Sequence, residues 1–178
     1  MNNLQKATFA GGCFWCIEAA FNKLKGVKSA ISGYIDGDLP NPTYKDICTG
    51  QSGYAEAVAI EFDASMIDYE TLLKIFFTVH DPTQVNKQGY DVGTQYRSAI
   101  YYHSDSQKHL AKRMIEDLNQ QKIWPLPIAT TVAHASQFYS AESEHQLYAV
   151  NNPNQPYCQL IINPKLEKLK SAFQDYIK

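Results

Sequence analysis

The stretch KATFAGGCFWCIEAAF, residues 6–21, decides how the chain begins. The run from Lys6 to Ala10 is short and apolar, as in a β-strand, and Gly11 and Gly12 interrupt it. Apolar residues then recur at helical spacing: Phe14, Ile17, Phe21 and Leu24. The pattern predicts a strand, a glycine turn and a helix that ends near Gly26, with Cys13 at the start of that helix.

The same criteria predict the elements of the remaining chain. Further strands are expected at 27–34, 55–62, 98–103 and 128–135, and helices at 69–80, 104–121, 141–150 and from Asn163-Pro164 onward. Asp68, and Ser104 with Gln107, are the expected N-terminal caps. Polar loops fill 36–53, with one helical turn near 44–48, and 81–95, and a Pro/Asn-rich coil follows at 151–156.

Strands and helices alternate without regular βαβ units. This order predicts an α+β fold, a two-layer sandwich in which helices pack on a mixed, mostly antiparallel sheet and long loops carry function. No repeat or linker divides the 178 residues, so we expect a single domain, 1–178.

Composition excludes several classes of function. The chain is 44% hydrophobic and 19% charged, with a net charge of −2 and no basic run, which argues against nucleic-acid binding. The N-terminus has no long apolar stretch, and no segment is apolar enough to cross a membrane. We therefore expect a soluble, cytoplasmic protein without a membrane partner.

Four cysteines are present, Cys13, Cys16, Cys48 and Cys158. In a reducing cytoplasm such thiols serve catalysis or metal binding more often than fixed disulfides. Zinc needs about four ligands, but there is no second Cys-x-x-Cys and the five histidines are scattered, so we expect no metal site.

Cys13 has the position of an activated nucleophile. Free N–H groups and the helix dipole at a helix N-terminus lower the pKa of a thiol, and the two glycines allow close approach of a substrate. A buried structural cysteine is the plainer alternative. Glu56 poses a similar choice, because a carboxyl in the apolar run Ala-Glu-Ala-Val-Ala-Ile is either on the solvent face or a buried acid with a raised pKa.

At this point the sequence resembles a known family. GCFWC at 12–16 is similar to the signature of the peptide methionine sulfoxide reductase A family. Further blocks follow in the family's order: NPTY at 41–44, GYAEAV at 53–58, DPTQ at 81–84, DVGTQYRSAIYY at 91–102 and AESEHQ at 141–146. The family folds as an α+β sandwich, in agreement with the pattern above.

The resemblance implies an enzyme that reduces methionine S-sulfoxide, free or in proteins, with thioredoxin as external reductant and no cofactor. Cys13 attacks the sulfoxide sulfur and Glu56 protonates the oxygen. Tyr44 and Tyr96 hold that oxygen, Asp91 joins their polar network, and Phe14 and Trp15 wall the methyl group. Glu142 and His145 support the site. Ordinary packing is the alternative for the rings, and loop capping for Asp91.

The resemblance makes Cys158 the resolving cysteine, in a coil that could swing toward Cys13. Cys16 competes, but a disulfide within a rigid helix would be strained, and Cys48 is expected to be a small buried residue. The glycine-rich C-terminal tail with a further cysteine that some members have is not found here, so no relay through such a tail is expected. We expect a monomer.

Two other functions fit the residues. A general thiol–disulfide oxidoreductase would use Cys13 and Cys16 and would not need Glu56. A non-catalytic module would bind methionine-containing peptides in the aromatic pocket without reducing them.

Overall fold

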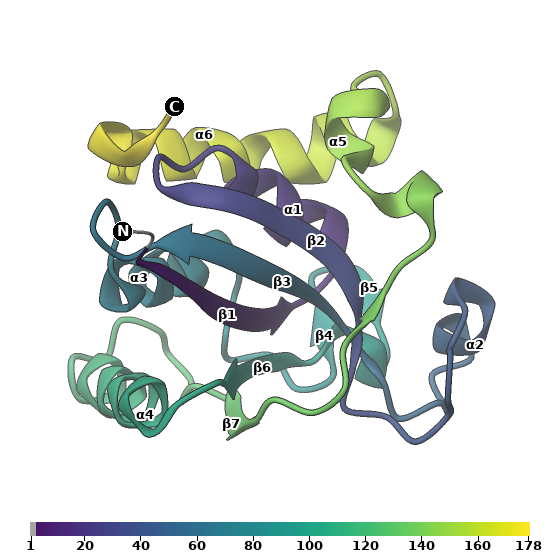
Figure 1. Cartoon of the computed structure of the whole chain (residues 1–178), viewed down its shortest axis with the longest axis horizontal. Helices are drawn as coiled ribbons and strands as arrows, with labels where there is room; N and C mark the ends of the chain where they lie inside the picture. Colours follow the sequence, from purple (N-terminus) through teal and green to yellow (C-terminus); the bar gives the residue numbers. More distant parts are fainter. Residues whose placement is uncertain (1–2) are drawn as a thin grey trace.

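The computed structural model describes residues 3–178 and is built on a six-stranded sheet of order β7-β6-β1-β3-β2-β8 (Figure 1). Its strands are β1 (Leu4–Gly11), β2 (Val27–Ile35), β3 (Ala55–Asp63), β6 (Ser98–Tyr102), β7 (Thr131–His134) and β8 (Tyr139–Ser140). Every neighbouring pair is antiparallel except β6 and β7, so the expected mixed, mostly antiparallel sheet is confirmed. A separate pair, β4 (Lys87–Gln88) and β5 (Asp91–Val92), structures the loop expected at 81–95.

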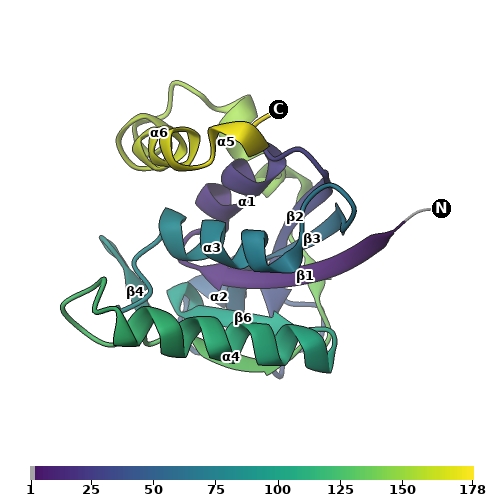
Figure 2. The same ribbon diagram turned by 90° about the vertical axis from the view of Figure 1, so that its left-hand side faces the viewer.

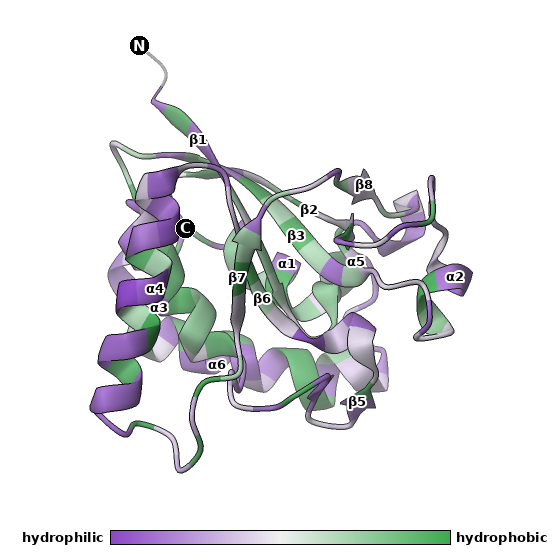
Figure 3. Ribbon diagram, turned by 90° about the horizontal axis from the view of Figure 1, so that it is seen from below, coloured by the Kyte–Doolittle hydropathy of each residue, from purple (hydrophilic) through white to green (hydrophobic). Residues whose placement is uncertain are grey.

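The helices are α1 (Phe14–Asn22), α2 (Tyr44–Cys48), α3 (Tyr69–Val79), α4 (Asp105–Gln120), α5 (Tyr148–Asn151) and α6 (Asn163–Ala172). All but α2 gather on one side of this sheet (Figure 2), and α2 lies apart from them, beyond one end of the sheet (Figure 1). α1 packs on β2 and β3, α4 packs on β6 and β7, and α6 lies outermost against α1 and α3. Hydrophilic and hydrophobic bands alternate along α4, as expected for a helix with one face in water (Figure 3). Within residues 3–178, no helix is long and apolar enough to span a bilayer.

The opposite side of the sheet is covered by a crossing segment. β7 and β8 lie at opposite edges, so residues 135–138 pass over the sheet between them (Figure 1). Phe138 packs there on a second small core that includes Ala55 and Ala57, whereas Val58 belongs to the main core under the helices. Because both faces of β3 are buried along most of its length, apolar residues occupy six of its nine positions, on both faces.

Two expected caps are present, and two details differ. Asp68 and Ser104 accept hydrogen bonds from Thr71 N and Gln107 N at the starts of α3 and α4. The Gln107 side chain accepts from His103 N instead of completing a capping box with Ser104 N. The strand expected at 128–135 forms only at 131–134, where β6 provides a partner.

The helix expected at 141–150 is wrong. The chain forms a 3₁₀ turn at Ser143–His145, breaks, and resumes helix only at α5. Leu147 lies in the left-handed region at φ 54°, and its N–H donates to the buried carboxylate of Glu18 at 2.9 Å. That bond from α1 replaces the helical bond the local sequence would favour.

The coil expected around Cys158 is also wrong. Residues 156–172 are continuously helical, with a π-helical turn at Cys158–Ile162 that leads into α6. Pro156, which argued for coil, stands in the first turn, where a helix does not use the missing N–H. Cys158 therefore lies in helix and is only 1% exposed.

Candidate active site

The turn before α1 aims Cys13 at the start of β3. Gly12 has φ +90°, and a Cβ added there would lie 2.7 Å from the Gln88 side chain, so this turn requires glycine. Cys13 follows as the N-cap of α1, with φ −58° and ψ 127°, outside the helix itself. The next N–H, that of Phe14, donates to Glu56 Oε1 at 3.1 Å. A carboxyl group thus anchors the helix that presents the thiol.

Glu56 is the buried acid of the two alternatives. The pairing of Phe9 with Val58 places the start of β3 beside the end of β1, and Glu56 shares the helix-covered face with Val58. The residue is 1% exposed. Burial raises the pKa of Glu56 to about 8, although the bond from Phe14 N favours the ionised form. Glu56 is therefore mainly protonated at neutral pH.

The expectation of a depressed pKa at Cys13 is wrong for the resting protein. Cys13 is 7% exposed. Burial raises its pKa well above the usual value, and the hydrogen bond to Cys16 and the charge of Glu56 act in the same direction. The bond from the backbone of Trp15 opposes these effects without overcoming them. Desolvation outweighs the helix N-terminus here, so Cys13 rests as a thiol.

The two predicted tyrosines lie close enough to Glu56 for its charge to affect their pKa values. Tyr44 and Tyr96 are half-buried, and burial, together with the charge of Glu56, raises the pKa of both phenols above the usual range. Both therefore stay neutral and able to donate. Tyr44 is fixed through its backbone, since its N–H donates to Glu142 Oε2 at 2.9 Å.

Phe14 and Trp15, the residues predicted to wall the methyl group, have different surroundings. Phe14 is buried beside Tyr44, with ring centroids 6.4 Å apart. Trp15 is half-buried, stacks on Tyr148 at 3.7 Å and donates from Nε1 to His145 Nδ1 at 3.3 Å. His145 and Glu142 thus support the site residues, as the sequence suggested.

Glu142, Glu144 and His145 also bring ligand-type atoms within 4.8 Å of one another, as a metal site would. However, both oxygens of Glu142 already accept hydrogen bonds, from Tyr34 and Tyr44. Since Nδ1 of His145 accepts from Trp15, the neutral ring carries its proton on Nε2. The cluster fits hydrogen bonding, not metal ligation.

Asp91 is connected to the thiol of Cys16 by the hydroxyl of Tyr157, a residue that the sequence analysis did not single out. Tyr157 donates from its hydroxyl to Asp91 Oδ2 at 2.7 Å, and the same hydroxyl lies 3.7 Å from Cys16 Sγ. The only sequence signal was its place beside Cys158. Cys48, expected to be buried, is exposed at the end of α2.

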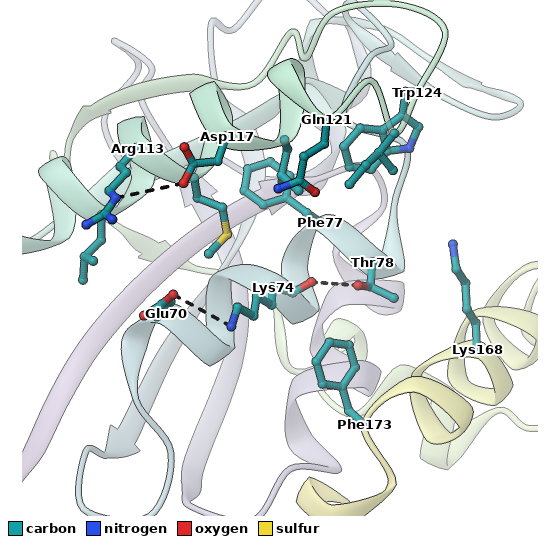
Figure 4. A pocket seen from close by; sticks show the side chains of 14 residues that line it. Glu70, Lys74, Phe77, Thr78, Arg113, Asp117, Gln121, Trp124, Lys168 and Phe173 are labelled. Atoms are coloured by element: carbon teal, nitrogen blue, oxygen red, sulfur yellow. Dashed lines mark hydrogen bonds and ion pairs between the residues drawn. The ribbon is translucent and has the colours of Figure 1, made fainter.

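A large groove of about 660 Å³ lies elsewhere, between α3, α4 and α6 (Figure 4). Phe77, Trp124 and Phe173 contribute apolar surface to it. Four of its five charged residues pair along their own helices, Lys74 with Glu70 at 3.8 Å and Arg113 with Asp117 at 4.0 Å, and Lys168 on α6 is the fifth. No cysteine or histidine is among its lining residues, so the reactive groups are not here.

A buried acid, neutral phenols and clustered thiols on an α+β sandwich define a thiol-dependent oxidoreductase. A family model described as peptide methionine sulfoxide reductase matches residues 5–177. The chain belongs to this family.

Individual relatives agree with this assignment. A peptide methionine sulfoxide reductase MsrA of Pasteurella multocida is 54% identical over 174 residues, which cover 98% of this chain and 99% of that protein. Among solved structures, reduced Mxr1 from Saccharomyces cerevisiae is similar with a TM-score of 0.81 and 34% identity, over 88% of this chain and 90% of that one. Mxr1 in complex with Trx2 is similar with a TM-score of 0.58 and 25% identity, over 83% and 86% of the two chains.

Proposed function

We propose that the chain reduces methionine sulfoxide, free or in proteins, to methionine, with Cys13 as the nucleophile and Glu56 as the acid. The observation that carries this assignment is the 3.1 Å bond from Phe14 N to Glu56 Oε1. It holds a carboxyl group that is protonated near neutral pH at the helix start that bears the thiol. This is the pairing that oxygen removal requires.

The step is a transfer of oxygen from substrate sulfur to Cys13. The Cys13 sulfur attacks the sulfoxide sulfur while Glu56 protonates the sulfoxide oxygen. The oxygen then passes to Cys13: a Cys13 sulfur–oxygen bond forms as the substrate sulfur loses its bonds to the oxygen and to Cys13, and methionine leaves. Cys13 becomes a sulfenic acid, and the proton of its thiol restores the Glu56 carboxyl. Sulfur in the substrate is reduced by two electrons, and sulfur in Cys13 is oxidised by two.

Neutral donors and an apolar wall fit the substrate's two ends. Tyr44 and Tyr96 would donate to the oxygen as negative charge develops on it, because their raised pKa values keep them protonated. Phe14 and Trp15 would enclose the methyl group. Asp91 joins this polar network, where its charge helps to keep Glu56 and Tyr96 protonated.

The sulfenic acid must be returned to a thiol before the next cycle. Cys158 is proposed to take part in forming a disulfide, which thioredoxin then reduces in the cytoplasm. The similarity to the Mxr1 structure with Trx2 supports such a partner.

The test is turnover with a peptide that contains methionine sulfoxide, using thioredoxin and its reductase as the electron source. We expect methionine to appear in step with reductant consumption. Binding without reduction would favour the peptide-binding module. Reduction of a disulfide substrate at equal rates in the wild type and Glu56→Gln, with no methionine formed, would favour a general oxidoreductase.

A further inference from the structure

The geometry of α1 removes the objection to a bridge between Cys13 and Cys16. The objection placed both residues inside a rigid helix, but Cys13 is the N-cap, with a non-helical ψ of 127°. Cys16 is the third residue of α1, and in a capping box the side chains of the N-cap and third positions each reach the backbone of the other, so both lie over the same first turn. Cys16 N also donates to Cys13 O at 3.1 Å, which closes this turn. A disulfide here leaves the helix wound.

Cys16 also faces the helix that carries Cys158. Its Sγ lies 3.7 Å from the hydroxyl of Tyr157, the residue that precedes Cys158, and the π-helical turn packs against α1. Burial and the charge of Cys16 both raise the pKa of Cys158. Cys13, in contrast, interacts with Cys16 and Glu56. Cys16 therefore interacts with both of the other thiols.

We infer that Cys16 is the first resolving thiol and that Cys158 is the second, in a relay that rests on the proposed function. The Cys16 sulfur attacks the Cys13 sulfenic sulfur, the sulfur–oxygen bond breaks, and hydroxide leaves as water with the thiol proton. Cys158 then attacks the Cys16 sulfur, a Cys16–Cys158 disulfide forms, and Cys13 leaves and regains a proton. The two-electron oxidation passes from Cys13 to the Cys16–Cys158 pair.

The ionisation of the thiols favours this order. The hydrogen bond from Cys13 lowers the pKa of Cys16 to about 7, so a substantial fraction is thiolate at neutral pH. Cys158 is the poorer first attacker because its pKa is raised. It also lies within the helix of residues 156–172, whereas Cys16 shares a hydrogen-bonded turn with Cys13.

The relay predicts a stoichiometry that can be counted. Reduced protein is mixed with excess methionine sulfoxide peptide and no reductant, and methionine is quantified together with the disulfide map. The wild type should release two methionines per chain, because transfer to Cys158 frees Cys13 for one more attack. Cys158→Ser should release one and stop as a Cys13–Cys16 disulfide. Cys16→Ser should release one and hold Cys13 as a sulfenic acid that a dimedone probe labels.

Cys48→Ser is the matched control, because Cys48 is exposed on α2, and it should keep a stoichiometry of two. One methionine per wild-type chain with a Cys13–Cys158 disulfide and free Cys16 would overturn the relay. One methionine with a stable Cys13–Cys16 disulfide and free Cys158 would overturn the second transfer. No methionine from the wild type would instead reject the proposed function. The Cys158→Ser result stands even if Cys16→Ser does not fold.

Discussion

Two helix starts carry the reactive thiols, and they are held in different ways. α1 begins sharply after Gly12, and its first N–H is bound by the carboxyl of Glu56 on the central strand β3. The helix of residues 156–172 begins with a π-helical turn that has no side-chain cap. Its anchor is the bond from Tyr157 to Asp91, which lies in the short β4–β5 pair.

The difference separates the two halves of the cycle. Oxygen transfer needs fixed geometry between thiol and acid, and the sheet provides it at α1. Disulfide exchange needs sulfur atoms to approach along a line and then part, and we expect the π-helical turn, a rare departure from the α-helix that is frequent at functional sites, to rearrange locally. Breaking each anchor should therefore damage a different step.

The largest effect is expected at the start of α1, which Glu56 holds in fixed geometry. Cys13→Ser should abolish methionine formation, because a serine oxygen is a far weaker nucleophile than a cysteine sulfur and cannot accept the sulfoxide oxygen as sulfur does. The measurement is methionine released in a single turnover, with the circular dichroism spectrum as the control for folding. If this variant still released methionine, another thiol would be the nucleophile, and the start of α1 would not be the place of oxygen transfer.

Glu56→Gln should have the second-largest effect on methionine formation. The amide keeps the acceptor for Phe14 N but cannot supply a proton, so single-turnover reduction should slow by roughly two to four orders of magnitude. Glu61→Gln, on the same strand, is the matched control and should leave the rate unchanged. A wild-type rate in Glu56→Gln would mean that the carboxyl only caps the helix.

Most of the fold could be predicted, because hydrophobic periodicity reports local structure. The strand–glycine–helix unit at 6–21, the cap at Asp68 and the mixed sheet all agree with the structure. The failures came from partners distant in sequence. Glu18 binds Leu147 N and breaks the helix expected at 141–150, and the start of the helix of residues 156–172 is fixed by a bond to Asp91.

The sequence predicted which residues form the site better than it predicted their burial and protonation. The family resemblance selected Glu56, Tyr44 and Tyr96, and the structure brings both phenols near the buried carboxyl. Sequence could not decide the burial of Glu56, because the crossing segment at 135–138 covers the second face of β3 and makes both faces apolar. Nor could it show that burial would raise the pKa of Cys13.

Burying Glu56 should also leave a signature in stability. Its pKa in the folded protein, about 8, lies above the usual 4.5, so its contribution is fully favourable below pH 4.5 and declines as the pH rises to about 8. Glu56→Gln lacks this loss. Relative to the wild type, the variant should gain a few kcal/mol between pH 5 and pH 8, at about 1.4 kcal/mol per pKa unit. Urea unfolding of both proteins at pH 5 and pH 8 measures this gain. If the difference in the free energy of unfolding between variant and wild type were the same at both pH values, the raised pKa of Glu56 would be contradicted.

The smallest effect is expected at the start of the helix of residues 156–172, where the π-helical turn lies. Tyr157→Phe removes the hydroxyl that bonds Asp91 and contacts Cys16, while its ring can still pack edge-on against Trp15. One lost hydrogen bond of about 1 kcal/mol should slow formation of the Cys16–Cys158 disulfide by about fivefold. The first methionine should appear at nearly the wild-type rate, since the bond from Phe14 N to Glu56 is untouched. Rapid quenching with an alkylating reagent separates the two rates, and Tyr176→Phe, beyond the end of α6, is the control. Slowing of the first methionine with unchanged disulfide formation would reverse the roles assigned to the two helix starts.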